Sequence, residues 1–323
     1  MSVKFSLHAE KQVRAIPRLP RVVGKGGRVA VFSPSSPASI ERTQKGIEEL
    51  RGLGFSVEPF RAVQNDAYFA GSAEARRNEF LDLLRRDDVA ALFALRGGYG
   101  ANYLVEGLSS NDFSSPKCII GFSDLTTLQV FLWQQCGWVS FYGPMVAAGL
   151  DGGAGNSGGY DADSLRNALA GAAPSNISLG GQSLFRGTAE GRVLGGATTL
   201  VEATLGTAWE LNTENSILLL EDRAVKPYQV DRVLMHFKQA GKFNGVRAII
   251  LGEFPECEPP VPGSPTVREV CERILGPLKI PIVFGAAVGH TARPMLTIPL
   301  GVRARLTAQG EGTLEILEPA ATT

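Results

Sequence analysis

The fold is decided by the stretch Lys117-Cys118-Ile119-Ile120-Gly121-Phe122-Ser123-Asp124, in which two kinds of periodicity meet. Its first four residues predict a buried strand, and apolar residues then recur at helical spacing: Leu125, Leu128, Phe131 and Leu132. A strand that runs directly into a helix places the Ser123 hydroxyl on an exposed turn, near the N–H groups of the helix. Such a serine is inert unless a base takes its proton. Ser123 is therefore a candidate nucleophile or a helix-capping residue, because the last glycine of the Gly-x-Ser-x-Gly elbow is missing.

On both sides of this stretch, the first half of the chain alternates between strand and helix patterns. We expect strands over Arg28–Ser33, Phe55–Phe60, Val89–Leu95, Lys117–Gly121 and Trp138–Tyr142, and helices over Ile40–Leu53, Ala73–Arg86 and from Asp124 onward. This alternation predicts an N-terminal doubly wound parallel α/β domain. In such a sheet, function is carried by loops at the carboxyl ends of the strands, here residues 33–37, 96–100 and 121–124.

The second half has a different composition. Six glycines stand between Gly149 and Gly159, so we expect an N-terminal domain over 1–149, a linker or crossing segment over 150–187 and a β-rich C-terminal domain over 188–323. The elements expected after the first glycine cluster are helices at Asp161–Leu169, Val230–Gln239 and Thr266–Ile274, and strands at Ser216–Leu220, Val246–Leu251, around Ile282, and at Leu296–Ile298, Val302–Leu306 and Thr313–Leu317.

Composition excludes several classes of function. The 323 residues carry 32 Lys plus Arg and 32 Asp plus Glu, so a neutral chain without a basic block argues against nucleic-acid binding. No apolar run approaches the roughly 18 residues of a membrane span, and the basic stretch Met1–Arg21 lacks the apolar core of a secretory signal. The four cysteines have no metal-binding spacing and are expected to be buried thiols in a reducing compartment. We therefore expect no metal and no cofactor.

The chain offers only three histidines as a base for Ser123. His290 follows Gly289 at the end of an apolar run and is the best placed. His236 lies inside a helical pattern and is expected to be half-exposed, and His8 lies in the N-terminal tail and is expected to be solvated. A carboxylate at the tip of a buried strand can fix the tautomer of a histidine. Glu221 and Asp222 both follow such a strand, and spacing alone does not separate them.

The loop Arg96-Gly97-Gly98-Tyr99-Gly100 has two interpretations. Glycines after a strand can cradle a phosphate, but neither GxGxxG nor GxxxxGK[ST] is present. Alternatively, a backbone N–H of Gly97 or Gly98 can stabilise an oxyanion beside Ser123, with the N–H of Asp124 as the second donor.

Taken together, these motifs resemble the serine peptidase family of LD-carboxypeptidases, which includes the microcin C immunity peptidases. The resemblance covers roughly residues 27–308 and rests on stretches in a shared order: 31–37, 96–100, 121–126, 191–196, 218–222, 228–234 and 289–290. After Gly195-Gly196 the family usually has asparagine where this chain has Ala197. After Glu221-Asp222 it often has a second glutamate where this chain has Val225.

The resemblance implies a triad of Ser123, Glu221 and His290, with backbone oxyanion donors at Gly98 and Asp124. It implies a parallel α/β domain, a β-rich C-terminal domain and a site in the cleft between them. It further implies a cytoplasmic homodimer without metal or cofactor, which acts on small peptides in murein (peptidoglycan) recycling.

The leading hypothesis is a serine LD-carboxypeptidase that hydrolyses the amide between an L-centre and a terminal D-amino acid of murein tetrapeptides. Arg96 and Arg293 are candidates for binding the free carboxylate of the substrate. The first alternative is cleavage of a peptidyl- or aminoacyl-nucleotide, with Trp138 or Trp209 to stack on the base. The second alternative is a non-catalytic protein that binds a small ligand.

Overall fold

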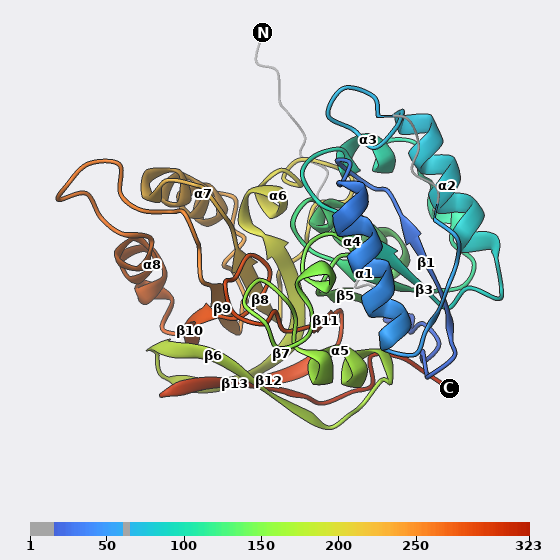
Figure 1. The fold of residues 1–323 in the computed structure, drawn as a ribbon. Helices are drawn as coiled ribbons and strands as arrows, with labels where there is room; N and C mark the ends of the chain where they lie inside the picture. Colours follow the sequence, from blue (N-terminus) through green and yellow to red (C-terminus); the bar gives the residue numbers. More distant parts are fainter. Residues whose placement is uncertain (1–15, 61–64) are drawn as a thin grey trace, which may run out of the picture.

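The computed structural model describes residues 16–60 and 65–323, which form two halves lying side by side (Figure 1). The first half is built on a sheet with the strand order β2-β1-β3-β4-β5-β11. Its strands are β1 (Arg28–Phe32), β2 (Ser56–Val57), β3 (Ala91–Ala94), β4 (Cys118–Gly121), β5 (Ser140–Tyr142) and β11 (Ile298–Leu300). Strands β1 to β5 pair in parallel, and β11 pairs antiparallel with β5. The chain changes direction across the sheet between β1 and β3, and ligands of doubly wound folds bind at such a switch point.

The helices of this half are α1 (Ile40–Gly52), α2 (Ala73–Arg85), α3 (Ala101–Val105), α4 (Thr126–Cys136) and α5 (Ala162–Leu169). Side chains of Ser39 and Ser72 cap α1 and α2 by accepting backbone N–H groups of the first turn. Helix α4 is buried over most of its length and packs against α6 and β7 of the other half. Apolar residues lie on both sides of α4, beyond the spacing that indicated a helix, because both of its sides are covered.

The second half is a closed barrel with the strand order β10-β6-β13-β12-β7-β8-β9. Its strands are β6 (Ser175–Phe185), β7 (Gly187–Ala197), β8 (Ser216–Glu221), β9 (Ala248–Gly252), β10 (Ile282–Ala286), β12 (Arg303–Gln309) and β13 (Glu311–Ile316). Strands β7 to β10 pair in parallel, with α6 (Thr198–Glu202), α7 (Pro227–Gln239) and α8 (Val267–Leu275) between them in the chain. The remaining pairs are antiparallel. The predicted fold class, a parallel α/β half and a β-rich half, is confirmed.

Strand β6 was not expected, and β11, which overlaps the strand expected at Leu296–Ile298, lies in the other half. Strand β6 belongs to the barrel although it falls inside the segment 150–187, which was expected to be a linker or crossing segment. Gly180 and Gly181 interrupt its alternation, and a Cβ on Gly181 would lie 2.8 Å from the backbone N of Ala286. Strand β11 carries the chain back to the first sheet, so neither half is a single continuous segment. The domain limits remain a prediction.

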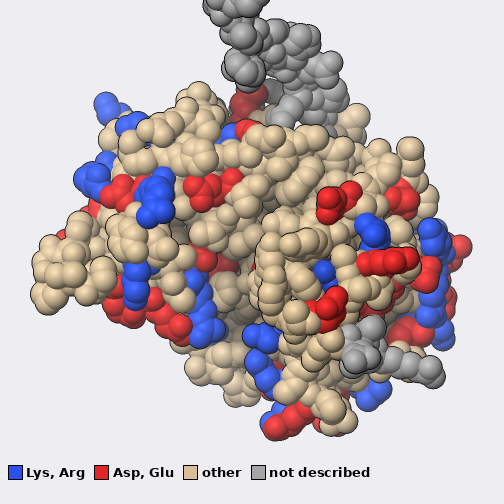
Figure 2. Space-filling model, turned by 90° about the horizontal axis from the view of Figure 1, so that it is seen from above, with Lys and Arg blue, Asp and Glu red and all other residues tan. Residues whose placement is uncertain are grey.

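Acidic and basic side chains are interspersed on the face seen in Figure 2. Within residues 16–60 and 65–323, no helix is both long and apolar enough to cross a membrane. The four cysteines are free thiols; Cys118, Cys257 and Cys271 are buried and Cys136 is partly buried.

Candidate active site

Ser123 lies on a tight turn between β4 and α4. Its φ of 60° is in the left-handed region, which a non-glycine residue occupies only when its surroundings hold it there. Gly121, just before the turn, has no room for a side chain, because a Cβ would overlap the side chain of Leu125. Ser123 itself is half-buried. The geometry is that of a strand-to-helix elbow.

Glu221 and His290 form a pair in the second half. Glu221 is the last residue of β8 and is fully buried. Its Oε2 accepts hydrogen bonds from the backbone N–H of His290 and from His290 Nδ1, both at 2.9 Å. The carboxylate is packed against Gly289, whose φ is +61°, and a Cβ at this position would overlap the Glu221 carboxylate. A glycine before His290 is therefore what lets the histidine loop close over the acid.

The environment of His290 suits a general base. Burial opposes the charged imidazolium, but the charge of Glu221 and its hydrogen bond outweigh this, so the pKa of His290 lies above its ordinary value. The ring of Phe122, next to Ser123, meets the imidazole edge-to-face with the ring centroids 5.0 Å apart. Because Glu221 holds Nδ1, the other ring nitrogen is the one left to exchange a proton.

A single hydroxyl connects the two halves at this site. Tyr142, at the end of β5, donates a hydrogen bond from Oη to Glu221 Oε1 at 2.5 Å, and the backbone N–H of Ser123 donates to the same Oη at 3.4 Å. The structure thus brings Ser123, Glu221 and His290 together from separate halves. Tyr142 was not singled out from the sequence, because its acidic partner lies 79 residues further along the chain.

The competing acid and the other histidines have different roles. Asp222 accepts the backbone N–H groups of Thr199 and Arg223, both at 2.9 Å, and so fixes the start of α6. His236 lies on α7, where its Nδ1 is 2.9 Å from the carboxylate of Glu202. His8 lies outside the described residues.

The glycine loop lies against the nucleophile turn. Gly97 faces Ser123 so closely that a Cβ on Gly97 would lie 3.0 Å from Ser123 Oγ. Among the described residues, no protein acceptor receives the N–H of Gly98 or of Asp124. Gly98 has a φ of +101°, and a Cβ there would overlap the side chain of Ser36. The conformation of Gly98 therefore requires glycine, whereas at Gly97 the absence of a side chain leaves space beside Ser123.

A buried polar network holds together the loops 33–37, 96–100 and 121–124. The side chain of Asp124 is buried, and its Oδ2 accepts the Ser35 hydroxyl at 2.5 Å and the Ala101 N–H at 2.8 Å. Arg76 of α2 is 1% exposed and donates to the carbonyls of Pro34, Gly71 and Gly100. Nothing in the amphipathic pattern of α2 marks Arg76 as a buried residue.

The residues considered for substrate recognition are mostly engaged elsewhere. Arg96 donates to the carbonyl of Pro37. Arg293 pairs with Glu253 and donates to the carbonyls of Gly180 and Gly285. Trp138 is 1% exposed in the first core, and Trp209 is partly buried with its ring 6.1 Å from that of Phe131. Arg293 is therefore engaged, whereas Arg96 is exposed and uses only Nη1 in its contact with Pro37. Trp138 cannot stack on a ligand.

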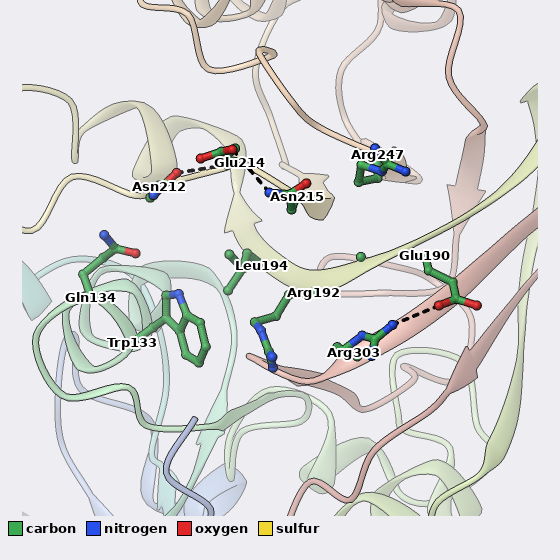
Figure 3. Close-up of a pocket in the computed structure, with 11 residues that line it drawn as sticks. Trp133, Gln134, Glu190, Arg192, Leu194, Asn212, Glu214, Asn215, Arg247 and Arg303 are labelled. Carbon is green, nitrogen blue, oxygen red and sulfur yellow. Dashed lines mark hydrogen bonds and ion pairs between the residues drawn. The ribbon is translucent and has the colours of Figure 1, made fainter. Parts of the chain in front are cut away.

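A separate pocket of about 660 Å³ lies between α4 and the barrel, and Figure 3 shows the residues that line it. None of the predicted site residues lines it. Arg303 pairs with Glu190 at 3.1 Å, and Arg192 pairs with Glu318 at 2.6 Å while it stacks on Trp133. These ion pairs neutralise the charges of Arg192 and Arg303 in the pocket. Within the described chain, no group of three or more His, Cys, Asp or Glu side chains is placed to hold a metal ion.

Comparisons with known proteins agree with this architecture. Family profiles match residues 29–143 as an LD-carboxypeptidase N-terminal domain and residues 190–306 as an LD-carboxypeptidase C-terminal domain. A putative carboxypeptidase of Synechocystis is 33% identical over 92% of this chain and 97% of its own length. A probable murein peptide carboxypeptidase of Bacillus subtilis is 30% identical over 92% and 94%. The solved structure of MccF in complex with glutamyl sulfamoyl guanosine has a TM-score of 0.84, 25% identity, and coverage of 95% of this chain and 100% of that one.

The matches extend over both halves, and the two family domains meet at the elbow and the His290 loop. The N-terminal family domain covers strands β1 to β5 of the sheet, and the C-terminal family domain covers most strands of the barrel. The predicted resemblance is confirmed: this chain belongs to the LD-carboxypeptidase family.

Proposed function

We propose that this protein is a serine LD-carboxypeptidase that releases the terminal D-amino acid of murein tetrapeptides. The observation that carries the proposal is the buried Glu221–His290 pair, which one hydroxyl connects to the strained turn of Ser123. A nucleophile, a base and an acid that orients the base are the parts of a hydrolytic triad. The name of the Bacillus subtilis relative supports a murein peptide as the substrate.

In the proposed reaction, His290 takes the proton of the Ser123 hydroxyl as the oxygen attacks the scissile carbonyl. The oxyanion accepts hydrogen bonds from the N–H groups of Gly98 and Asp124, each worth on the order of 3 kcal/mol in the transition state. Glu221 stabilises the imidazolium. The C–N bond then breaks, and His290 passes its proton to the leaving amine of the D-amino acid. Water, activated by His290, hydrolyses the acyl-enzyme and restores Ser123.

The alternative substrate is a peptidyl- or aminoacyl-nucleotide, and the structural match to MccF supports it. The chemistry at Ser123 is the same for both substrates. The names of two relatives, in Bacillus subtilis and Pseudomonas aeruginosa, favour the murein peptide. Of the two tryptophans considered for stacking on a base, Trp138 is buried and cannot do so, whereas Trp209 is only partly buried.

The test is to assay the purified protein on a murein tetrapeptide and on an aminoacyl sulfamoyl nucleoside, with Ser123→Ala beside the wild type. We expect release of D-alanine by the wild type and a loss of at least about 10⁴-fold in Ser123→Ala. Ser110→Ala, which changes an exposed serine at the start of a short 3-10 helix, is the matched control and should keep the full rate. An unchanged rate in Ser123→Ala would rule out the triad, and a preference for the nucleoside would select the alternative substrate.

A fluorophosphonate serine probe separates a hydrolase from a protein that only binds its ligand. Labelling that depends on Ser123 supports catalysis, and absence of labelling together with absence of turnover supports a binding protein. The homodimer, the cytoplasmic location and the small-peptide partner remain predictions from the resemblance.

A further inference from the structure

Tyr142 occupies a position that the proposed reaction does not yet explain. It is the last residue of β5 and is completely buried. Its Oη contacts the machinery on both sides, Glu221 Oε1 at 2.5 Å and the backbone N of Ser123 at 3.4 Å. Its ring meets that of Phe122 edge-to-face at 6.3 Å. The side chain of Thr126, at the start of α4, is a further hydrogen-bond partner of this hydroxyl. The other two partners, Glu221 and the backbone of Ser123, belong to the candidate triad.

The direction of these hydrogen bonds is fixed by chemistry. Burial and the neighbouring Glu221 raise the pKa of Tyr142 well above its ordinary value, so the phenol keeps its proton. The N–H of Ser123 can only donate, and it therefore occupies a lone pair of Oη. The single proton of the phenol is then directed to the carboxylate of Glu221.

Both carboxylate oxygens of Glu221 therefore accept hydrogen bonds. Oε2 accepts the backbone N–H and Nδ1 of His290, and Oε1 accepts the hydroxyl of Tyr142. A carboxylate held through both oxygens cannot rotate about its last bond, so the imidazole that it orients cannot rotate either. Tyr142 comes from the first half, and Glu221 and His290 come from the second.

We propose that Tyr142 is a positioning residue for the reaction, which sets the Glu221–His290 pair in register with Ser123 across the junction of the two halves. This inference rests on the proposed function. Tyr142 touches no substrate atom. Its hydroxyl donates a hydrogen bond to Glu221 Oε1 and accepts one from the backbone N–H of Ser123, and so fixes the acid relative to the nucleophile.

The experiment compares Tyr142→Phe with Tyr160→Phe. Tyr160 is the matched control, since it is also fully buried and also donates to a glutamate, Glu49 Oε1 at 2.8 Å, but it is not part of the site. For Tyr142→Phe we expect kcat to fall about 10- to 100-fold with KM within about twofold, because displacement of reacting groups by up to 1 Å has effects of this size. Tyr160→Phe should keep the wild-type kcat.

The pH profile adds a readout that a merely structural role would not move. Without the phenol, more of the charge on Glu221 is left to act on His290, so the acid limb of kcat/KM should move to higher pH. The charged and titratable groups around His290 are otherwise unchanged: Asp222, Arg223 and Glu256. NMR titration of the histidines provides the same measurement without turnover, with His236 as the internal reference.

A second variant covers the case in which Tyr142→Phe does not fold. Incorporation of 3-fluorotyrosine at position 142 keeps the ring and makes the phenol a stronger donor, so the acid limb should move to lower pH. The inference is overturned if Tyr142→Phe keeps the wild-type kcat and pH profile, or if the fluorinated protein shows no shift. It is also overturned if Tyr142→Phe and Tyr160→Phe lose activity equally. If Ser123→Ala remains active, the proposed function fails instead, whatever Tyr142 does.

Discussion

Replacing Gly97 with alanine should block the nucleophile without disturbing the fold. Gly97 lies in the loop after β3 and faces Ser123. An ideal Cβ at this position would lie 2.9 Å from Ser123 Cβ, 3.0 Å from Ser123 Oγ and 3.4 Å from Met145 Cε. The backbone of Gly97 does not occupy the left-handed region, so alanine can adopt its conformation. The effect of the variant is therefore confined to the space that the new methyl group takes.

The size of the effect follows from these distances. Carbon atoms pack at roughly 3.5–4.0 Å, so the new methyl group and Ser123 Cβ must separate by about 0.6–1 Å. A displacement of about 1 Å at a reacting group lowers the rate by roughly 10²-fold. Overpacking of one methyl group destabilises a core by about 1–3 kcal/mol. We therefore expect kcat/KM to fall about 100-fold while the protein stays folded.

The assay is release of D-alanine from a murein tetrapeptide, with thermal unfolding measured in parallel. Gly52→Ala is the control, because a Cβ at Gly52 would have nothing within 4 Å and its φ is not left-handed. This control should keep full activity. A Gly97→Ala protein with the wild-type kcat/KM would refute the reasoning, since it would mean that the space next to the Ser123 hydroxyl is not used in the reaction.

Three further predictions concern the acid, the base and the supporting network. Glu221→Gln should lower kcat by about 10²–10⁴-fold and move the acid limb of kcat/KM to lower pH, because the negative partner that raises the pKa of His290 is lost; an unmoved limb in the pH–rate profile would contradict this. In the wild type, kcat/KM should fall as the pH drops through the raised pKa of His290. The stability that this raised pKa contributes should be full below the ordinary histidine pKa of about 6.5 and should be lost as the pH rises through the pKa of His290 in the folded protein. Denaturant titrations between pH 5 and 9, with His290→Gln as the reference, measure this contribution to the free energy of unfolding. Arg76→Met should lower the free energy of unfolding by about 3 kcal/mol, because three buried carbonyls lose their donor and Asp124 loses a nearby positive charge; a change below about 0.5 kcal/mol in urea unfolding would show that the network is not stabilising.

The elements that could be predicted from sequence are those with strong local signals. The helices Ile40–Leu53 and Ala73–Arg86 were expected, and the structure has them within a residue at each end. Their serine caps and apolar spacing act locally, so no distant contact is needed to define them. The capping box of Thr266 and Glu269 is confirmed for the same reason.

The elements that could not be predicted depend on distant partners. A short strand was expected at Leu296–Ile298, but the pairing of β11 with β5, which places it in the first sheet, has no local signal. Helices α3 and α6 have five residues each, which is too short for an apolar period to be recognised. Strand β6 contains Gly180 and Gly181, and glycine disrupts the alternation by which a strand is recognised.

At the candidate site, the residue types could be predicted, but their relative positions could not. Glu221 and Asp222 are neighbours at the end of one strand, and successive side chains of a strand point to opposite faces. The sequence does not tell which face meets His290; the barrel decides it, by packing Gly289 against Glu221. Tyr142 and Arg76 were missed because a buried hydroxyl or guanidinium has no local signature.

The central claim is that a serine of the first half and a histidine of the second act as one catalytic unit. The most direct test is a double-mutant cycle of Ser123→Ala and His290→Ala, with the rate of D-alanine release measured for all four proteins. We predict that each single variant loses at least about 10⁴-fold and that the double variant is no slower than the slower single variant. Single variants that retain more than a tenth of the wild-type rate, or whose losses multiply in the double variant, would contradict the account.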